Sequence, residues 1–294
     1  MGYFGIMGKA KKSSLLFLVI LVGLNILGWL AVYDLSHQDF EVIFFDVGQG
    51  DSTLIKTPQG HHILIDGGPN SSVLEKLGKE MPFWERTVDL IILTHPEQDH
   101  LSGLIEVLRR YRVENILWTG VLKETAVFEE WQRLIKEEKA NIYIAKAGEL
   151  VLAGQTFLEI IHPFESFENQ KVQNVNNTSI AFRAVFGENS FLFTGDAFKE
   201  VERELVNSGV NLRSNVLQVG HHGSRTSTAP EFVAAVFPEV AVISAGKDNK
   251  FGHPNLEVLE TLANYGILIF RTDQEGDIKI ISNGKTYAIS LIQN

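Results

Sequence analysis

The residues best suited to chemistry lie in one short segment, which contains His95, Glu97, Asp99 and His100. An apolar run at residues 88–94 precedes them and predicts a buried strand, and a stretch with helical apolar spacing follows. Side chains two and four residues apart in an extended segment point the same way, so the first three can converge. Imidazole and carboxylate ligands together favour zinc, manganese or iron over calcium. The segment therefore predicts a metal centre.

Three other apolar runs also end in polar residues that could join such a centre. They are followed by Asp66, by Asp196 and by the pair His221–His222. An aspartate beside glycine is usually part of a turn or a helix cap. Together with the first segment, however, these residues supply the ligands of a two-metal site. In such sites a carboxylate bridges two ions about 3.5–4 Å apart, and the bridging water becomes a nucleophile near neutral pH.

Alternating apolar runs and turn residues predict a chain of many short strands with helices between them. The expected strands are 40–45, 52–57, 61–66, 88–94, 115–118, 141–145, 179–186, 190–194, 216–219, 240–244, 268–271, 277–282 and 285–290, and a hairpin is expected near residues 153–155. The expected helices are 71–79, 101–111, 126–138, 198–208, 229–235 and 255–265. No linker rich in Pro, Gly or Ser interrupts residues 38–294. This order predicts one α+β domain with two packed sheets and outer helices.

The turn after the first strand contains Asp46, Gln49 and Asp51 among glycines. Aspartate and glycine favour tight turns, so we expect these three residues to shape a hairpin.

An uncharged stretch at residues 13–33 is long enough to cross a bilayer as a helix. Lys9, Lys11 and Lys12 precede it, and the positive-inside rule places such a basic segment, residues 1–12, in the cytoplasm. The sequence therefore predicts a single-pass protein of the cell membrane, with residues 38–294 as an extracytoplasmic domain. A cleaved signal peptide, which would give a secreted protein, is the alternative.

The composition limits the chemistry of the site and of its substrate. The 294 residues include 0 cysteines, so a metal must be held by His, Asp, Glu or Asn. The net charge is −10, and no basic patch of the kind that holds nucleic-acid phosphates stands out. The acidic balance argues for a small or weakly charged substrate.

The ligand segments, in their order along the chain, resemble the motifs of the metallo-β-lactamase superfamily. These segments are Leu64–Gly68, Thr94–His100, Phe193–Asp196 and His221–Ser224. Four others resemble the hydrolase domain of ComEC, the competence DNA-internalisation family: Phe45–Ser52, Asn176–Ser179, Gly252–Pro254 and Arg271–Asp273. The resemblance covers residues 40–290. It implies a four-layer αββα sandwich, here preceded by one transmembrane helix, with the metal site along one edge of the sheets.

The resemblance also implies a set of metal ligands. By this comparison the first ion is held by His95 and Glu97, the second by Asp99, His100 and His222, and Asp196 bridges the two. Glu97 stands where the superfamily usually has a histidine, and this replacement weakens the first position.

Further residues are assigned to the surroundings of the metals by the same resemblance. Asp66 is expected to orient His100 or His95, a role that fixes the tautomer of a ligand. His221 is expected to face the substrate, and His253 to contact the substrate or act as a general acid. Asn177 belongs to the segment that replaces a family histidine, and it is expected beside the site.

The expected function is that of a metal-dependent hydrolase for phosphoesters, either a phosphodiesterase or a nuclease that acts on single-stranded DNA. The resemblance implies one or two divalent ions, zinc or alternatively manganese. An envelope phosphoesterase of the phosphorylcholine-esterase type is a related alternative. A non-catalytic, metal-stabilised binding module is the alternative from another class. Apart from the substrate and the membrane, no protein partner is predicted.

Overall fold

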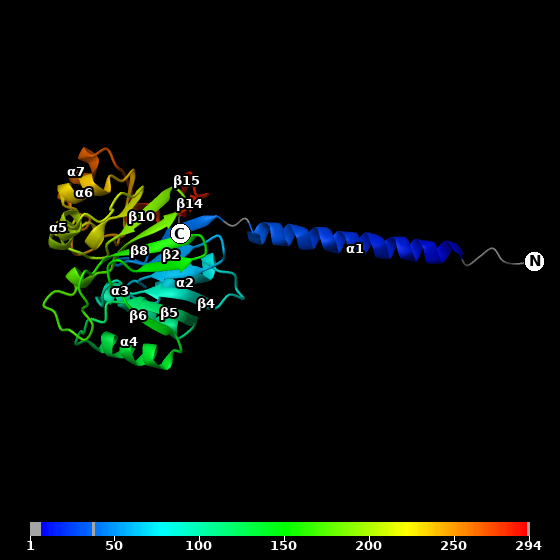
Figure 1. The fold of residues 1–294 in the computed structure, drawn as a ribbon, viewed down its shortest axis with the longest axis horizontal. Coiled ribbons are helices and arrows are strands. Elements are labelled where there is room, and N and C mark those ends of the chain that lie inside the picture. Colours follow the sequence, from blue (N-terminus) through cyan, green and yellow to red (C-terminus); the bar gives the residue numbers. More distant parts are fainter. Residues whose placement is uncertain (1–6, 37–38, 293–294) are drawn as a thin grey trace, which may run out of the picture. The chain divides into compact units, whose positions relative to one another are not determined.

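The computed structural model describes residues 7–36 and 39–292, and in helix α1 (Met7–Ser36) it describes the side chains of residues 14–29 (Figure 1). Residues 1–38 and 39–294 form two separate units. The first unit contains only α1, and the second contains every other element.

The predicted membrane anchor is corrected by the structure. Among the described residues, no helix has both the length and the apolar character that a bilayer crossing requires. The assignment of residues 13–33 as a span, and the cell-membrane location derived from it, are therefore not upheld. Residues 1–6 of the predicted basic segment lie outside the described residues.

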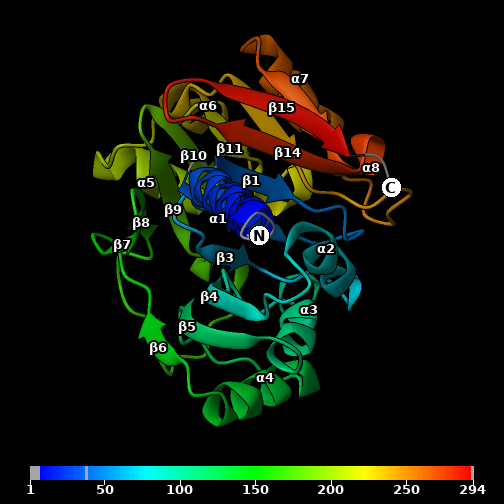
Figure 2. The same cartoon turned by 90° about the vertical axis from the view of Figure 1, so that its right-hand side faces the viewer.

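The first sheet of the second unit has eight strands in the order β15-β14-β1-β2-β3-β4-β5-β6 (Figure 2). Their bounds are β1 Phe40–Phe44, β2 Thr53–Lys56, β3 His62–Ile65, β4 Thr87–Ile92, β5 Arg112–Trp118, β6 Asn141–Ile144, β14 Asp277–Ser282 and β15 Tyr287–Ile292. Strands β3 to β6 run parallel to one another, and the pairs from β15 to β3 are antiparallel.

The second sheet has seven strands in the order β13-β12-β11-β10-β9-β8-β7. Their bounds are β7 Leu150–Ala153, β8 Thr156–His162, β9 Ala181–Phe186, β10 Asn189–Phe193, β11 Val216–Gln218, β12 Val240–Ile243 and β13 Leu268–Arg271. Strands β10 to β13 are parallel, so each sheet contains one parallel block. The carboxyl ends within such a block meet at one edge of its sheet.

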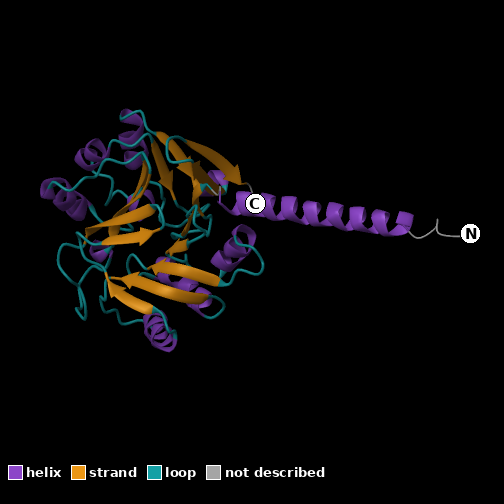
Figure 3. Ribbon diagram, turned by 45° about the vertical axis from the view of Figure 1, so that its right-hand side comes forward, coloured by secondary structure: helices purple, strands orange, loops and turns teal. Residues whose placement is uncertain are grey.

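Helices cover the outer faces of both sheets, which are packed on each other (Figure 3). The helices are α2 Ser72–Glu80, α3 Gln98–Leu108, α4 Ala126–Glu137, α5 Lys199–Ser208, α6 Pro230–Val236, α7 Leu256–Asn264 and the short α8 Thr272–Glu275, with 3₁₀ turns η1 Asn176–Thr178 and η2 Gly220–Gly223. Helices α2, α3 and α4 pack on the first sheet. Helices α5, α6 and α7 pack on the second.

The two-residue alternation of β1 shows how the sequence builds these layers. Val42 and Phe44 point into the core between the sheets, together with residues such as Phe193 of β10. Ile43 points to the opposite face and joins the core under α2, α3 and α4. Because successive side chains of a strand point to opposite faces, one apolar run can serve both cores. The predicted arrangement of two sheets flanked by helices is therefore confirmed.

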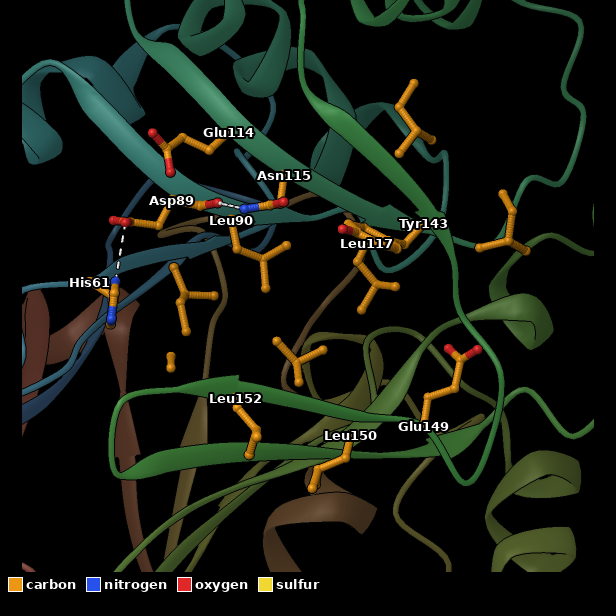
Figure 4. A pocket seen from close by; sticks show the side chains of 15 residues that line it. His61, Asp89, Leu90, Glu114, Asn115, Leu117, Tyr143, Glu149, Leu150 and Leu152 are labelled. Atoms are coloured by element: carbon orange, nitrogen blue, oxygen red, sulfur yellow. Dashed lines mark hydrogen bonds and ion pairs between the residues drawn. The ribbon is translucent and has the colours of Figure 1, made fainter.

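A cavity of about 760 Å³ lies between the edge strands β6 and β7 (Figure 4). Its lining includes Leu150 and Leu152 of β7, Tyr143 of β6 and the ion pair His61–Asp89. His61 directly precedes β3 and Asp89 is the third residue of β4, so this ion pair lies toward the amino ends of the two strands. None of the predicted metal ligands lines it.

Candidate metal centre

The predicted site residues follow the carboxyl ends of parallel strands in the two sheets. Asp66 follows β3 and His95 follows β4, and these two strands are neighbours. Asp196 follows β10, and the pair His221–His222 follows β11, which are neighbours in the other sheet. Polar groups at the carboxyl ends of parallel strands are the usual place for a ligand site in α/β sheets.

A close contact between two glycines fixes the start of α3 beside the turn that follows β3. A Cβ atom on Gly103 would lie 1.8 Å from the carbonyl oxygen of Gly67, so no larger residue fits there. The Gly67 amide donates to the His100 carbonyl oxygen at 2.7 Å, and the Gly103 amide donates to Gly68 at 3.0 Å. The first turn of α3, which carries His100, is therefore held against Asp66.

The carboxylate of Asp196 lies at the centre of a group of four imidazoles. Its Oδ1 is 3.3 Å from Nε2 of His100. Its Oδ2 is 3.8 Å from Nε2 of His95 and 3.7 Å from Nε2 of both His221 and His222. Asp196, His95, His100 and His222 are buried. One carboxylate thus meets four ring nitrogens that come from both sheets.

Several of these atoms are buried without any hydrogen-bond partner among the described residues. They are Nε2 of His95, His100 and His222 and Oδ1 of Asp196. Buried polar atoms are nearly always satisfied, so a group of unsatisfied ones that face each other indicates a binding site. One ligand atom from each of Asp51, His100, Asp196 and His222 lies within 4.8 Å of the others. The donor set of nitrogen and carboxylate oxygen atoms fits a divalent metal ion.

Asp66 holds His100 in the orientation that a metal ligand needs. Its Oδ2 is 2.8 Å from Nδ1 of His100 and accepts a hydrogen bond from the Thr94 hydroxyl at 2.7 Å, and its Oδ1 accepts from the Thr94 amide at 2.9 Å. A proton on Nδ1 toward Asp66 leaves the lone pair of Nε2 directed at Asp196. Carboxylates behind a ligating histidine fix its tautomer in this way. Of the two histidines considered from the sequence, the structure places Asp66 against His100.

Asp51 stands behind His222 in the same manner, and the sequence reasoning missed it. Its Oδ1 is 3.1 Å from Nδ1 of His222, and its Oδ2 accepts from Nε2 of Gln218 at 2.8 Å. Its turn-forming neighbours predict only a hairpin role for Asp51. The signal that could have found it is strand pairing, because Thr53 pairs with Ile65, which brings the residues that flank them, Asp51 included, to the edge where Asp66 lies.

The two carboxylates of the ligand segment point to different neighbours. We call the buried donors His95, His100, Asp196 and His222 the cluster. Oδ2 of Asp99 is 3.3 Å from Nε2 of His222, so Asp99 lies beside the cluster. The carboxylate of Glu97 instead pairs with the ammonium group of Lys123 at 2.5 Å, and Glu97 is outside the four-residue group. Glu97 also precedes α3 directly, which places its side chain at the helix start rather than within the first turn.

The remaining predicted residues lie around the cluster. His221 is half-buried, and its Nδ1 is 2.8 Å from the Thr226 hydroxyl, which leaves Nε2 toward Asp196. The His253 ring is 5.8 Å from that of His221 and 6.5 Å from that of His222. Asn177 lies further out, and its Oδ1 accepts from the backbone amide of Phe198 at 3.0 Å. Asn177 therefore supports the chain that follows Asp196.

The protonation of the cluster favours positive charge at its centre. Burial acts to raise the pKa of Asp196, but the charges of His100 and His222 outweigh it and hold that pKa well below its usual value. Burial acts to lower the pKa of His100 and of His222, but the neighbouring carboxylates raise both well above normal. Burial and the nearby His100 lower the pKa of His95. A bound cation would replace the protons that these carboxylates otherwise attract.

Residues 45–247 match the family described as the metallo-beta-lactamase superfamily. This match covers most of the chain and includes every member of the cluster. The chain belongs to the metallo-beta-lactamase superfamily. Its predicted membership is confirmed, and the superfamily's association with bound metal agrees with the unsatisfied donor atoms at Asp196.

Two competence proteins are similar to this chain over most of the length of this chain. ComE operon protein 3 of Bacillus subtilis is 31% identical over 92% of this chain and 37% of its own length. Competence protein ComA of Neisseria gonorrhoeae is 32% identical over 83% of this chain and 32% of its own length. The predicted relation to ComEC-type proteins is confirmed. The chain spans about a third of the length of these relatives.

Two solved structures share the fold of this chain at low sequence identity. The metallo-beta-lactamase fold protein YhfI of Bacillus subtilis has a TM-score of 0.54 at 15% identity, covering 80% of this chain and 96% of its own. CmlA, a diiron β-hydroxylase of Streptomyces venezuelae, has a TM-score of 0.55 at 16% identity, covering 83% and 54%. Identity at this level establishes the fold alone.

Proposed function

We propose that this chain is a metal-dependent phosphodiesterase that cleaves single-stranded DNA or a chemically similar phosphodiester. The observation that carries the proposal is the buried Asp196 carboxylate, which lies within 3.3–3.8 Å of four imidazole nitrogens. One or two divalent ions, zinc or manganese, suit this donor set. When bound, they supply a Lewis acid for the phosphoryl oxygens and lower the pKa of water.

The residues of the chain divide into those that hold the metal and those that face the substrate. His95, His100, His222 and Asp196 supply buried donor atoms for the ions. His221 is only half-buried, and burial lowers its pKa, so its ring is neutral near pH 7. A neutral imidazole near the reacting group can accept a proton from it.

His253 is a second group that can exchange a proton with the substrate. Burial, followed by the charge of His222, lowers its pKa. Its Nδ1 has no hydrogen-bond partner within the described part of the chain, as is expected of an atom that waits for a ligand. Since the pKa of both rings is lowered, His221 and His253 place two neutral imidazoles that can accept a proton on one side of the cluster.

The substrate class rests on the competence relatives and on the metal chemistry. The resemblance to the ComEC competence DNA-internalisation family, whose matching relatives are ComE operon protein 3 and competence protein ComA, supports a nucleic-acid substrate for this domain. A pair of metals suits phosphodiesters because it stabilises both the attacking and the leaving oxygen. An envelope phosphodiester would make the same demands on the site.

A non-catalytic binding module is the second candidate, and one observation favours it. Glu97, which was expected to complete the first metal position, pairs with Lys123. A site with one ion can stabilise the fold without performing hydrolysis.

The test compares the full-length chain with its Asp196→Ala variant. After removal of metal by a chelator and reloading with Zn²⁺ or Mn²⁺, the original protein should hydrolyse bis(p-nitrophenyl) phosphate and labelled single-stranded DNA. Asp196→Ala should lose both bound metal and hydrolysis, and Asp39→Ala, a change at an exposed residue, should lose neither. Full metal content with no phosphodiester cleavage would support the binding module instead.

A further inference from the structure

A row of four rings extends from the metal cluster to the surface. Phe198 stacks on His221 with ring centroids 5.2 Å apart and planes 13° apart. The His221 ring meets that of His253 edge-on at 5.8 Å. Phe251 then stacks on His253 at 5.7 Å with planes 24° apart. Phe251 is therefore one ring away from an imidazole that touches the metal cluster.

The loop that carries Phe251 is held in place by the side chain of Asn249. Its Nδ2 donates to the carbonyl oxygens of Gly246 at 2.9 Å and His253 at 2.6 Å. Its Oδ1 accepts from the amides of Phe251 at 3.2 Å and His253 at 3.0 Å. Gln49 links the loop to the first hairpin, since its Oε1 accepts from the Gly246 amide at 3.1 Å. The position of Phe251 is thus set before any substrate arrives.

Phe251 is nevertheless exposed over 57% of its surface. A single exposed phenylalanine is common on protein surfaces, but Phe251 lies on a loop that hydrogen bonds hold in place beside the cluster. The ammonium group of Lys250 lies 5.2 Å from its ring centroid. No ion pair involves Lys250, Lys247 or Arg225 among the residues that the structure describes, and these basic residues lie within four positions of Phe251 or His222 in the chain.

We propose that Phe251 stacks against a nucleobase of the phosphodiester substrate next to the bond that is cleaved. This inference rests on the proposed function and adds the recognition of a base to it. Single-strand binding sites combine aromatic rings that stack on bases with basic side chains that follow the backbone. When a base stacks on the Phe251 ring, the ammonium group of Lys250 moves from that ring to a phosphate of the substrate. In an acidic domain, stacking supplies affinity that does not depend on net charge.

Binding is measured first, on the full-length chain in EDTA, where no cleavage interferes. The probes are a fluorescent thymidylate octamer and an abasic octamer of the same length and charge. Loss of a stacked base weakens binding by roughly 5- to 150-fold, so Phe251→Ala and Phe251→Leu should weaken binding of the thymidylate octamer by that factor. Neither change should affect the abasic octamer, and Phe251→Trp should preserve the preference.

The matched control is Phe237, which is also exposed and lies under a cation, because the guanidinium of Arg213 is 5.0 Å from its ring. Phe237 lies between α6 and β12, at the amino end of β12, away from the cluster. Phe237→Ala should leave the binding of both octamers unchanged. If Phe251→Ala weakens both octamers equally or neither, or if the original protein binds both equally, the inference is wrong.

Hydrolysis separates failure of this inference from failure of the proposed function. With metal present, Phe251→Ala should raise KM for the thymidylate octamer and leave kcat and the abasic octamer little changed. Cleavage of both octamers at equal efficiency by the original protein would retain the phosphodiesterase and reject base stacking. Base-dependent binding without cleavage of any phosphodiester would retain base stacking and reject the phosphodiesterase.

Discussion

Oδ1 of Asp51 lies 3.1 Å from Nδ1 of His222, although 171 residues separate them in the chain. Asp66 has the same relation to His100, at 2.8 Å. Two buried histidines of the cluster are therefore each supported by a buried carboxylate, one pair built within the first sheet and the other across the two sheets.

Asp51→Asn tests whether this support matters for metal binding. The asparagine side chain has the same size as aspartate but carries no negative charge, so it accepts the hydrogen bond from Nδ1 of His222 more weakly. Loss of such a partner typically lowers metal affinity about 10- to 100-fold, so titration with Zn²⁺ should show a loss of that size. Asp46→Asn is the control, because the carboxylate of Asp46 accepts from the Gly48 amide within the same turn. Unchanged affinity in Asp51→Asn would reduce Asp51 to a hairpin residue.

The adjacent histidines should separate metal binding from turnover. His222→Ala removes a buried donor atom at the cluster and should lower bound metal and activity together. His221→Ala should leave the metal content near normal and slow turnover by about 10²–10⁴-fold, the usual contribution of an acid or base. Metal analysis of both purified variants, beside their rates, provides the measurement. If His221→Ala instead loses metal and His222→Ala keeps it, His221 is the metal ligand and His222 faces the substrate.

Glu97→Gln decides between the ligand expected from the family pattern and the ion pair seen in the structure. Because the Glu97 carboxylate lies 2.5 Å from Lys123, we expect the variant to keep its bound metal. Asp99→Asn, a matched change at the cluster, should lower it. Metal content measured on both proteins is sufficient. A loss in Glu97→Gln as large as that in Asp99→Asn would restore Glu97 as a ligand.

Glu202 should make the stability of the domain depend on pH. Burial raises the pKa of its carboxyl group to about 7, although the carboxylate accepts from the amides of Thr228 and Ala229 at 2.6 and 2.7 Å. A raised acid pKa means that the folded state prefers the protonated form. Its contribution is complete below the unfolded value of about 4.5 and is lost as the pH rises through about 7.

Urea denaturation of the original protein and of Glu202→Gln at pH 5 and pH 8 measures this effect. The free energy of unfolding of the original should fall relative to the variant by on the order of 3 kcal/mol between the two pH values. A constant difference would mean that the hydrogen bonds keep Glu202 ionised throughout.

Local patterns were sufficient for most of the fold. Strand β13 has the predicted bounds of Leu268–Arg271, and strands β1 and β4 differ from their predicted bounds by one or two residues. Helix α3 begins at Gln98, three residues before the predicted apolar spacing, because its first turn is polar and carries ligands. Polar residues at strand ends also located the four segments of the cluster, since a carboxylate or imidazole there lies at the sheet edge.

Residues whose roles depend on distant partners were not predictable in this way. The role of Asp51 follows from its contact with His222 across the two sheets, and a turn-forming motif conceals it. The direction of Glu97 depends on Lys123, which lies beyond β5. The membrane anchor was inferred from an uncharged stretch and the lysines that precede it, and the described residues contain no helix that meets the requirements for a span.

The four-residue group joins the two halves of the sandwich. Asp51 and His100 extend from the first sheet, and Asp196 and His222 extend from the second. An ion held by His100, Asp196 and His222, with Asp51 supporting His222, would link the two sheets to each other, in addition to its part in the reaction. Because a ligand that binds only the native state stabilises it by mass action, the free-ion concentration would then govern how long the domain survives heating.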